Sequence, residues 1–116
     1  FITASSYLKT ISTEKVSIHC DIREDVRGKD VLLIEDIADS GITLNYIRER
    51  ILAASPNSVR ICVFLNKCGR RVVDVPLDYI GFEIPNEYVV GYGLDYDNKF
   101  RNLPYISIFK KTTDEA

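Results

Sequence analysis

The sequence predicts an α/β fold built around a parallel sheet, and three neighbouring segments carry that prediction. VLLIE at residues 31–35 is typical of a strand, residues 43–55 have apolar side chains near helical spacing, and SVRICVFL at residues 58–65 is strand-like again. Strand, loop, helix, turn and strand thus follow one another within about 35 residues, which is the pattern of a βαβ unit. The two strands of such a unit run parallel and are joined by a right-handed crossover.

The elements before this unit are predicted from alternation and from turn composition. FITASSY at residues 1–7 indicates the end of a strand that passes into a polar turn, and residues 8–15 indicate a loop. In KVSIHCDI at residues 15–22, apolar residues alternate with polar ones, which predicts a half-buried strand. Residues 23–30 are then a charged turn.

Within the βαβ unit, VLLIE is continuous and apolar, so we expect a central strand that is buried on both faces. The helix is predicted to run from Thr43 to Ser55 and to end before Pro56-Asn57. Its apolar positions are Leu44, Ile47, Ile51, Leu52 and Ala54.

The C-terminal part is predicted to be less regular. In chain order we expect a basic turn (66–71), a short strand (71–75), two further strands (79–82 and 88–91), a polar loop (93–102), a last strand (105–109) and a polar tail (110–116). No internal repeat or linker argues for a second domain.

Composition excludes several classes of protein. A chain of 116 residues with 46% hydrophobic and 28% charged residues is an ordinary globular domain. The net charge of -2 gives no broad basic footprint for nucleic acid, although clustering of cations could still form a local one, and neither a membrane span nor a signal peptide is recognisable. Three cysteines without CxxC spacing favour reduced thiols and a cytoplasmic protein over disulfides or a zinc site.

The chain starts at Phe1 and contains no Met. We therefore expect it to be part of a longer protein, with the missing portion at least partly before Phe1.

The main candidate site is the acidic loop that follows VLLI. Glu35, Asp36 and Asp39 precede the small-residue segment Ser40-Gly41-Ile42-Thr43, which opens the predicted helix. Backbone N–H groups at such a helix start bind phosphate, whereas carboxylates bind hydroxyls or a divalent cation such as Mg²⁺. A ribose 5-phosphate satisfies both. The alternative is a solvated acidic turn whose Asp39 or Ser40 only caps the helix.

Four segments together resemble the hypoxanthine-guanine phosphoribosyltransferases, a branch of the type I phosphoribosyltransferase family. IEDIADSGITL resembles the phosphoribosyl diphosphate-binding motif, and FLNKCGRR resembles the lysine turn. GFEIPNEYVVGYGLDYDNKFRNLPYI resembles the purine-binding hood, and ASSY the start of the mobile catalytic loop. The match extends from Phe1 to about Phe109.

The resemblance implies a fold and an activity. The fold would be Rossmann-like, with a parallel sheet flanked by helices and part of a C-terminal hood, in a single domain at residues 1–116 that lacks its N-terminal portion. The reaction would transfer the 5-phosphoribosyl group of phosphoribosyl diphosphate to N9 of a 6-oxopurine with the help of Mg²⁺, in purine salvage. Relatives form dimers or tetramers, so a homodimer or homotetramer is expected.

The resemblance also implies residue roles on the phosphoribosyl side. Asp39 would be the general base near purine N7. Glu35 and Asp36 would contact the ribose hydroxyls and Mg²⁺. The 5′-phosphate would be held largely by backbone amides of Ser40, Gly41, Ile42 and Thr43.

On the purine and pyrophosphate side, Lys67 would donate to the exocyclic O6 of the base, Tyr88 would stack on it, and Val89 would meet its edge through the backbone. Asp95 would ligate a second Mg²⁺, and Arg101 would bind pyrophosphate. Ser6 and Tyr7 would belong to the loop that closes over the reacting centre.

Taken singly, several of these residues have plainer readings. Lys67 could be a solvated loop residue, Tyr88 could be strand core, and Asp95 with Arg101 could be a surface ion pair. The single histidine, His19, is expected to be structural.

The sequence also departs from the family pattern. Asn66 stands where Asp is frequent, Cys68 stands where Pro is common, and the segment after Ser6-Tyr7 lacks the usual glycines. The pyrophosphate-binding loop of relatives precedes the point that matches Phe1, so this chain alone is not expected to form a complete active site. A second reading stays open: a non-catalytic regulatory protein that senses phosphoribosyl diphosphate or nucleotide, for which a base at Asp39 is unnecessary.

Overall fold

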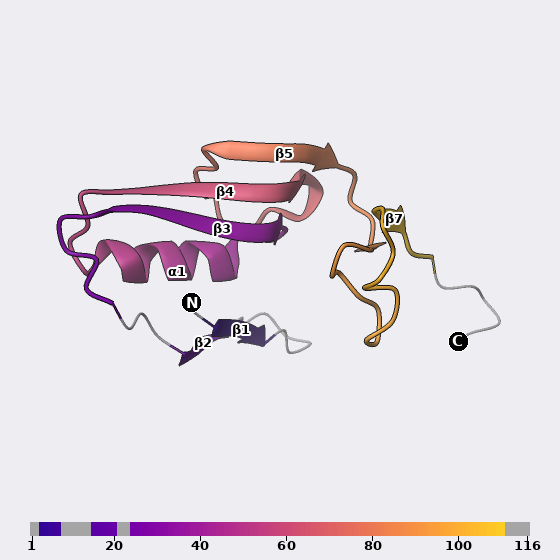
Figure 1. Cartoon of the computed structure of the whole chain (residues 1–116), viewed down its shortest axis with the longest axis horizontal. Coiled ribbons are helices and arrows are strands. Elements are labelled where there is room, and N and C mark those ends of the chain that lie inside the picture. Colours follow the sequence, from indigo (N-terminus) through magenta and orange to yellow (C-terminus); the bar gives the residue numbers. More distant parts are fainter. Residues whose placement is uncertain (1–2, 8–14, 21–23, 111–116) are drawn as a thin grey trace. The chain divides into compact units, whose positions relative to one another are not determined.

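The computed structural model describes residues 3–7, 15–20 and 24–110. The acidic loop follows one strand of a three-stranded parallel sheet. The strands of this sheet are β3 (Asp30–Ala38), β4 (Ser58–Lys67) and β5 (Tyr79–Ile84), in the order β3-β4-β5. Helix α1 (Ile42–Leu52) connects β3 to β4 and lies against one face of this sheet (Figure 1). The predicted βαβ unit with parallel strands is confirmed.

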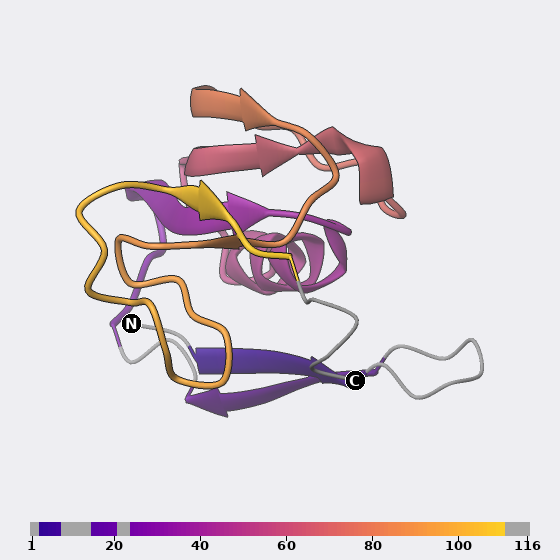
Figure 2. The same cartoon turned by 90° about the vertical axis from the view of Figure 1, so that its right-hand side faces the viewer.

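Helix α1 lies against one face of the sheet in both views (Figure 2), and the hydrophobic core is largely formed by side chains of these elements. Because side chains alternate between the two faces of a strand, Ile61, Val63 and Leu65 of β4 point the same way, and all are at most 2% exposed. The core cluster combines buried side chains from β3, α1, β4 and the segment after β4: Ala38, Leu44, Ile61, Val63 and Val75.

Helix α1 begins one residue earlier and ends three residues earlier than the predicted range. Its N-cap is Gly41, with a φ of 85°, and its buried face is formed by Leu44, Ile47 and Ile51. After Leu52 the chain leaves the helix, and Ser55 has a φ of 57°. The helical region is sterically disfavoured for a residue before proline, and Pro56 follows Ser55, so the helix ends short of it.

The prediction that VLLIE is a central strand buried on both faces is wrong. Strand β3 lies at the edge of the described three-stranded sheet, and its residues alternate in exposure. Leu33 packs against the core cluster, whereas Leu32 is 52% exposed and Ile34 is 72% exposed on the other face. No described element covers that face, so the continuous apolar run is buried on one side only.

The short strand predicted at residues 71–75 is also wrong. The chain after β4 forms a 3-10 turn, η1 (Cys68–Arg70), and then an irregular segment. The N–H groups of Val72 and Val73 donate to the carbonyl of Ser40, at 2.8 and 3.0 Å, instead of pairing with a strand. Val75 enters the core, which explains the apolar pattern of the segment.

Strands β1 (Thr3–Tyr7) and β2 (Lys15–Cys20) form a separate antiparallel pair. The strand predicted near residues 15–22 is present, and the strand end predicted within residues 1–7 is β1, which continues to Tyr7 instead of passing into a polar turn within that range. The predicted loop at residues 8–14 and the C-terminal tail lie outside the described residues, as does the predicted burial of β2.

Residues Pro85–Ala116 make up a second compact unit, separate from Phe1–Ile84. Strands β6 (Val89–Val90) and β7 (Ser107–Ile108) pair antiparallel within it. The polar loop between them is predicted correctly, and it contains several residues with positive φ: Gly91, Tyr92, Gly93, Asp97, Asn98 and Phe100. The assignment of residues 1–116 to a single domain stays a prediction.

Candidate functional site

The acidic residues of the site lie at the carboxyl end of β3, the edge of a parallel sheet where ligands bind. Strand β3 extends to Ala38, so Glu35 and Asp36 belong to the strand itself and Asp39 follows it directly. The N–H of Asp36 donates to Glu35 Oε1 at 3.0 Å, and the N–H of Ile37 donates to Asp36 Oδ1 at 2.7 Å. These bonds hold the two carboxylates close to the strand end.

The environment of Glu35 disfavours its charged form. Burial, followed by the hydrogen bond with Asp36, raises the pKa of Glu35 from 4.5 to about 7. A bound cation or a set of ligand hydroxyls would relieve the same effect, because either stabilises the ionised carboxylate. This carboxyl is therefore suited to a ligand that brings positive charge or hydrogen-bond donors.

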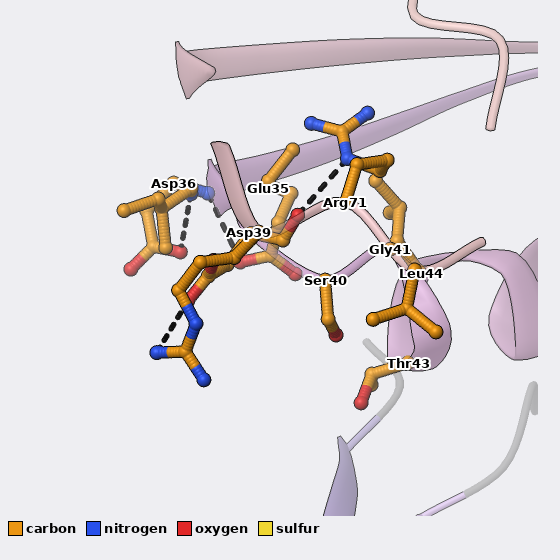
Figure 3. A pocket seen from close by; sticks show the side chains of 12 residues that line it. Glu35, Asp36, Asp39, Ser40, Gly41, Thr43, Leu44 and Arg71 are labelled. Carbon is orange, nitrogen blue, oxygen red and sulfur yellow. Dashed lines mark hydrogen bonds and ion pairs between the residues drawn. The ribbon is translucent and has the colours of Figure 1, made fainter. Parts of the chain in front are cut away.

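The small-residue segment forms the turn from β3 into α1. Gly41 is the helix N-cap, and the N–H of Ile42 donates to Ser40 Oγ at 3.3 Å. The first turn of α1 contains no acidic residue, so no carboxylate of that turn competes with an anion for the positive end of the helix dipole and the backbone N–H groups. The hydroxyls of Ser40 and Thr43 point to the same side of the turn (Figure 3).

Gly41 is required by its surroundings as well as by its φ. A Cβ at this position would lie 2.4 Å from the carbonyl oxygen of Val73, which is far inside van der Waals contact. The segment after β4 therefore packs directly on the turn that begins α1.

A cavity of about 610 Å³ brings most of the predicted phosphoribosyl-binding residues together. It is lined by the carboxylates of β3, the turn into α1 and the segment after β4: Glu35, Asp36, Ile37, Ala38, Asp39, Ser40, Gly41, Thr43, Leu44, Arg70, Arg71 and Val72. Of the predicted set, Ile42 is not among the lining residues, although its N–H lies at the helix start.

Asp39 lies beside the lysine turn. Its Oδ2 atom is 3.6 Å from Lys67 Nζ and 3.9 Å from Arg70 Nη1. Lys67 is only 6% exposed, so the plainer reading of Lys67 as a solvated loop residue is wrong. Among the described residues, Asp39 Oδ1 is a buried oxygen without a hydrogen-bond partner, which leaves one carboxylate oxygen available to accept a proton.

Sequence reasoning missed Arg71. Its Nε donates to the carbonyl of Asp39 at 2.9 Å (Figure 3), and its Nη2 donates to Asn66 Oδ1. The basic composition of residues 66–71 was a signal that cations gather here, but composition does not say which carbonyl a guanidinium contacts.

In the second unit, the predicted residues contact one another through a local loop. The hydroxyl of Tyr88 donates to the carbonyl of Asp95 at 2.6 Å, and Arg101 Nη2 is 3.3 Å from Asp95 Oδ1. Arg101 Nη1 also donates to the carbonyl of Gly93 at 2.7 Å. Tyr88 is 50% exposed, so it is not strand core, whereas Val89 is buried in β6.

Ser6 and Tyr7 are the last two residues of β1, where they pair with Val16 and Lys15. The loop to which the resemblance assigns them continues into residues 8–14, outside the described part of the chain. Cys62 and Cys68 are both free thiols, as the cysteine count predicts. None of the described helices has the length and apolar character needed to cross a bilayer.

These features define a class of protein. A small-residue turn between a parallel strand and a helix start, bordered by carboxylates, is typical of α/β proteins that bind a phosphorylated sugar.

Comparison with known proteins makes the class specific. The model of the phosphoribosyl transferase domain matches residues 1–97, and the chain belongs to this family. The chain is 54% identical over 107 residues to a hypoxanthine phosphoribosyltransferase of Escherichia coli, covering 91% of this chain and 60% of that protein. It is 44% identical over 117 residues to a hypoxanthine-guanine phosphoribosyltransferase of Bacillus subtilis, covering 100% of this chain and 65% of the relative.

Solved structures agree with this assignment. The fold matches a hypoxanthine phosphoribosyltransferase from Staphylococcus aureus with a TM-score of 0.87 and 43% identity, over 95% of this chain and 60% of that one. The predicted fold class is thereby confirmed. The chain thus spans about 60% of the length of several relatives that it matches.

Proposed function

We propose that the protein acts in purine salvage by transferring the 5-phosphoribosyl group of phosphoribosyl diphosphate to N9 of hypoxanthine or guanine. The C1′–O bond to pyrophosphate breaks, the C1′–N9 bond forms, and IMP or GMP and pyrophosphate are the products. The names of the relatives support this reaction. The observation that carries the proposal is the position of Asp39, between the cavity and Lys67.

The phosphoribosyl group would lie across the turn into α1. Its 5′-phosphate would accept hydrogen bonds from the backbone amides of residues 40–43 and from the hydroxyls of Ser40 and Thr43, where the helix dipole favours negative charge. The ribose hydroxyls would donate to Glu35 and Asp36. Their negative charge would also favour the oxocarbenium-like character that develops at C1′.

Asp39 would act as the general base near purine N7. One of its oxygens faces Lys67 and the other is buried without a partner, so the carboxylate is oriented and can still accept a proton. A positioned base of this kind typically contributes about 10²–10⁴-fold to the rate.

Lys67 would select 6-oxopurines by donating to O6. The ammonium is buried, so a 6-amino group in place of the oxygen would leave it facing another donor. The same cation, 3.6 Å from Asp39 Oδ2, would orient the base.

Residues of the second unit would contribute to the binding of purine and pyrophosphate. Tyr88 presents a half-exposed ring that could stack on the base, and Val89 would contact the base edge through its backbone. Arg101 would bind pyrophosphate, and Asp95 would ligate a cation. Ser6 and Tyr7 would belong to a loop that excludes water from the reacting centre.

The carboxylates fit a divalent cation, which we propose to be Mg²⁺. The described residues contain no group of three or more His, Cys, Asp or Glu side chains suited to a metal ion, but Mg²⁺ usually takes one or two carboxylates together with substrate phosphates. The adjacent Glu35 and Asp36 supply such a pair, and burial raises the pKa of Glu35, so a bound cation would favour the ionised form of this carboxyl. When bound, the cation would neutralise charge on the departing pyrophosphate.

We further propose a cytoplasmic homodimer or homotetramer that acts on small molecules, without a nucleic-acid or membrane partner. The alternative is a non-catalytic sensor of phosphoribosyl diphosphate or nucleotide. A sensor does not need the Asp39–Lys67 arrangement, and the relatives named above are transferases, so the enzyme is favoured.

The test is an assay of the gene product that carries this sequence, with phosphoribosyl diphosphate, MgCl2 and a panel of hypoxanthine, guanine, xanthine and adenine. We expect nucleotide and pyrophosphate to form from hypoxanthine or guanine, with kcat/KM for adenine lower by about 10²-fold or more. Binding of phosphoribosyl diphosphate or nucleotide without any turnover would favour the sensor.

A further inference from the structure

We infer that Arg71 is a positioning residue of the proposed reaction, because its guanidinium ties the backbone of Asp39 to the lysine turn through Asn66 and Glu83. The inference rests on the proposed function, and it adds three residues to which neither the family motifs nor the pocket chemistry assigns a role.

The guanidinium of Arg71 bridges two strand ends. Its Nε donates to the carbonyl of Asp39 at 2.9 Å, and its Nη2 donates to Asn66 Oδ1. Asp39 follows β3, and Asn66 is the penultimate residue of β4. Only a planar, forked donor can make both bonds in one fixed geometry, since the ammonium of a lysine is a point charge on a flexible stem.

The orientation of Asn66 is set from its other side by Glu83. Asn66 Nδ2 donates to Glu83 Oε2 at 3.0 Å and to Oε1 at 3.2 Å. The sheet register places Ala38 opposite Asn66 and Asn66 opposite Glu83, so the three residues form one row across β3, β4 and β5. Asn66 is 5% exposed, and its hydrogen bonds are therefore shielded from competition with water.

The row has a definite electrostatic order. A guanidinium donates to the amide oxygen of Asn66, and the amide nitrogen donates to the carboxylate of Glu83, so each bond polarises the next. Cys68 Sγ also contacts Glu83 Oε2, at 3.1 Å, and this bond raises the pKa of the Cys68 thiol. In a protein with Asp at position 66, that carboxylate would pair directly with the guanidinium of Arg71. In this chain the carboxylate belongs to Glu83, one strand further away, and the amide of Asn66 connects it to Arg71.

This network acts on the reacting groups through the backbone. The carbonyl that Arg71 holds belongs to Asp39, whose carboxylate faces Lys67 at 3.6 Å. Lys67 in turn follows Asn66 directly. Arg71 thus sets the distance between the proposed base and the proposed purine donor, and a displacement of about 1 Å in such a pair can lower the rate about 10²-fold.

The network also predicts which substitutions can compensate one another. Asn66→Asp alone would place a second carboxylate about 3 Å from Glu83, and the like charges would repel. Adding Glu83→Gln removes that repulsion, because the new amide can donate to the introduced carboxylate while that carboxylate accepts from Arg71. Such a rescue is expected only if residue 66 accepts from the guanidinium of Arg71 and is also hydrogen-bonded to residue 83.

The experiment compares steady-state kinetics of five variants of the gene product with the wild type: Arg71→Met, Arg71→Lys, Asn66→Asp, Glu83→Gln and Asn66→Asp/Glu83→Gln. Arg60→Met is the matched control, because Arg60 is an exposed arginine at the other end of β4. We expect Arg71→Met to lower kcat about 10–100-fold with little change in the KM for phosphoribosyl diphosphate, and Arg71→Lys to recover only a small part. Asn66→Asp should lower kcat about tenfold, and the double variant should return to within about threefold of wild type.

Wild-type kcat in Arg71→Met, or a double variant no faster than Asn66→Asp, would overturn the inference. If Arg71→Met does not fold, the Asn66 and Glu83 variants still decide. Turnover by the wild type tests the proposed function separately. Should the wild type show none, hydrogen exchange of the backbone amides at residues 39–44 supplies the test: Arg71→Met must speed it several-fold and Arg60→Met must not, and equal exchange contradicts the inference.

Discussion

The two units of the chain hold their candidate site residues in different ways. In the first, Asp39 directly follows β3 and Lys67 is the last residue of the neighbouring strand β4, and the register of Ala38 opposite Asn66 sets their spacing. In the second, Asp95 and Arg101 are held by local bonds within one loop, with side chains that are 30% and 53% exposed.

This difference indicates which unit suits proton transfer and which suits binding and release of a charged product. Parallel strand ends, fixed by ladder hydrogen bonds and a buried core, suit groups that must be positioned precisely enough to move a proton. An exposed loop with residues at positive φ suits groups that bind and release a charged product. Substitutions in the first unit should therefore affect stability and catalysis together, whereas those in the second should mainly affect binding.

The largest effect on stability is expected from Gly41→Ala. The new Cβ would lie 2.4 Å from the Val73 carbonyl at a φ of 85°, so strain and overlap should lower the free energy of unfolding by about 3 kcal/mol and activity by about 10²-fold or more. Gly28→Ala is the matched control, because Gly28 also has positive φ but nothing lies within 4 Å of its added Cβ. Thermal unfolding and kinetics measure both effects; equal destabilisation by the two variants would contradict the packing argument.

Lys67→Met should come next. Loss of the buried ammonium removes the proposed donor to O6 and a cation 3.6 Å from Asp39, so kcat/KM for hypoxanthine should fall about 30–100-fold. The KM for phosphoribosyl diphosphate should change little. Lys29→Met, at an exposed position before β3, is the control for loss of a lysine. An unchanged preference for 6-oxopurines over adenine in Lys67→Met would remove Lys67 from the purine site.

Arg101→Met tests the second unit, where we expect an effect on binding with little effect on stability. We expect the KM for phosphoribosyl diphosphate to rise about tenfold, because a charged contact to pyrophosphate is lost. The ion pair with Asp95 is half exposed, so the free energy of unfolding should change by no more than about 1 kcal/mol. Lys99→Met removes an exposed cation from the same loop and serves as the control. A stability loss as large as that of Gly41→Ala would show that the two units do not differ as described.

The smallest effect is expected from Glu35→Gln in metal-free buffer. The pKa of Glu35 is raised from 4.5 to about 7 in the folded state, so the fold favours its neutral form. The associated stability is present below pH 4.5 and is lost as pH rises through about 7. Above pH 7 the variant should therefore be more stable than wild type by about 1 kcal/mol, a value discounted for partial exposure.

Thermal unfolding between pH 4 and 8, with Glu24→Gln as an exposed control, measures this difference. A constant gap between wild type and Glu35→Gln across that range would mean that Glu35 is not the titrating group.

The sequence predicted the parts of the fold that periodicity and chain order determine. The βαβ unit follows from one short apolar strand, helical spacing and a second strand, and these local patterns agree with the tertiary structure. The exposure of Leu32 and Ile34 could not be predicted in the same way, because a continuous apolar run does not say how many of its faces are covered.

The same distinction between local patterns and long-range contacts applies to the candidate site. The sequence could predict Glu35, Asp36, Asp39 and the turn into α1 because they are contiguous, and the structure places most of them around one cavity. Sequence patterns could predict neither the contacts of Arg71 nor the irregular course of residues 71–75, because both depend on how the chain after β4 folds back over Gly41. That return is a long-range backbone contact, and single-sequence patterns carry no signal for it.

The most direct test of the account is Asp39→Asn in the gene product. The amide cannot accept the purine proton, but it preserves the shape of the side chain, so kcat should fall about 10²–10⁴-fold while the affinity for phosphoribosyl diphosphate stays within a few-fold of wild type. Steady-state kinetics with hypoxanthine and equilibrium binding measure the two quantities. An unchanged kcat would contradict the role of Asp39 as the base between the cavity and Lys67.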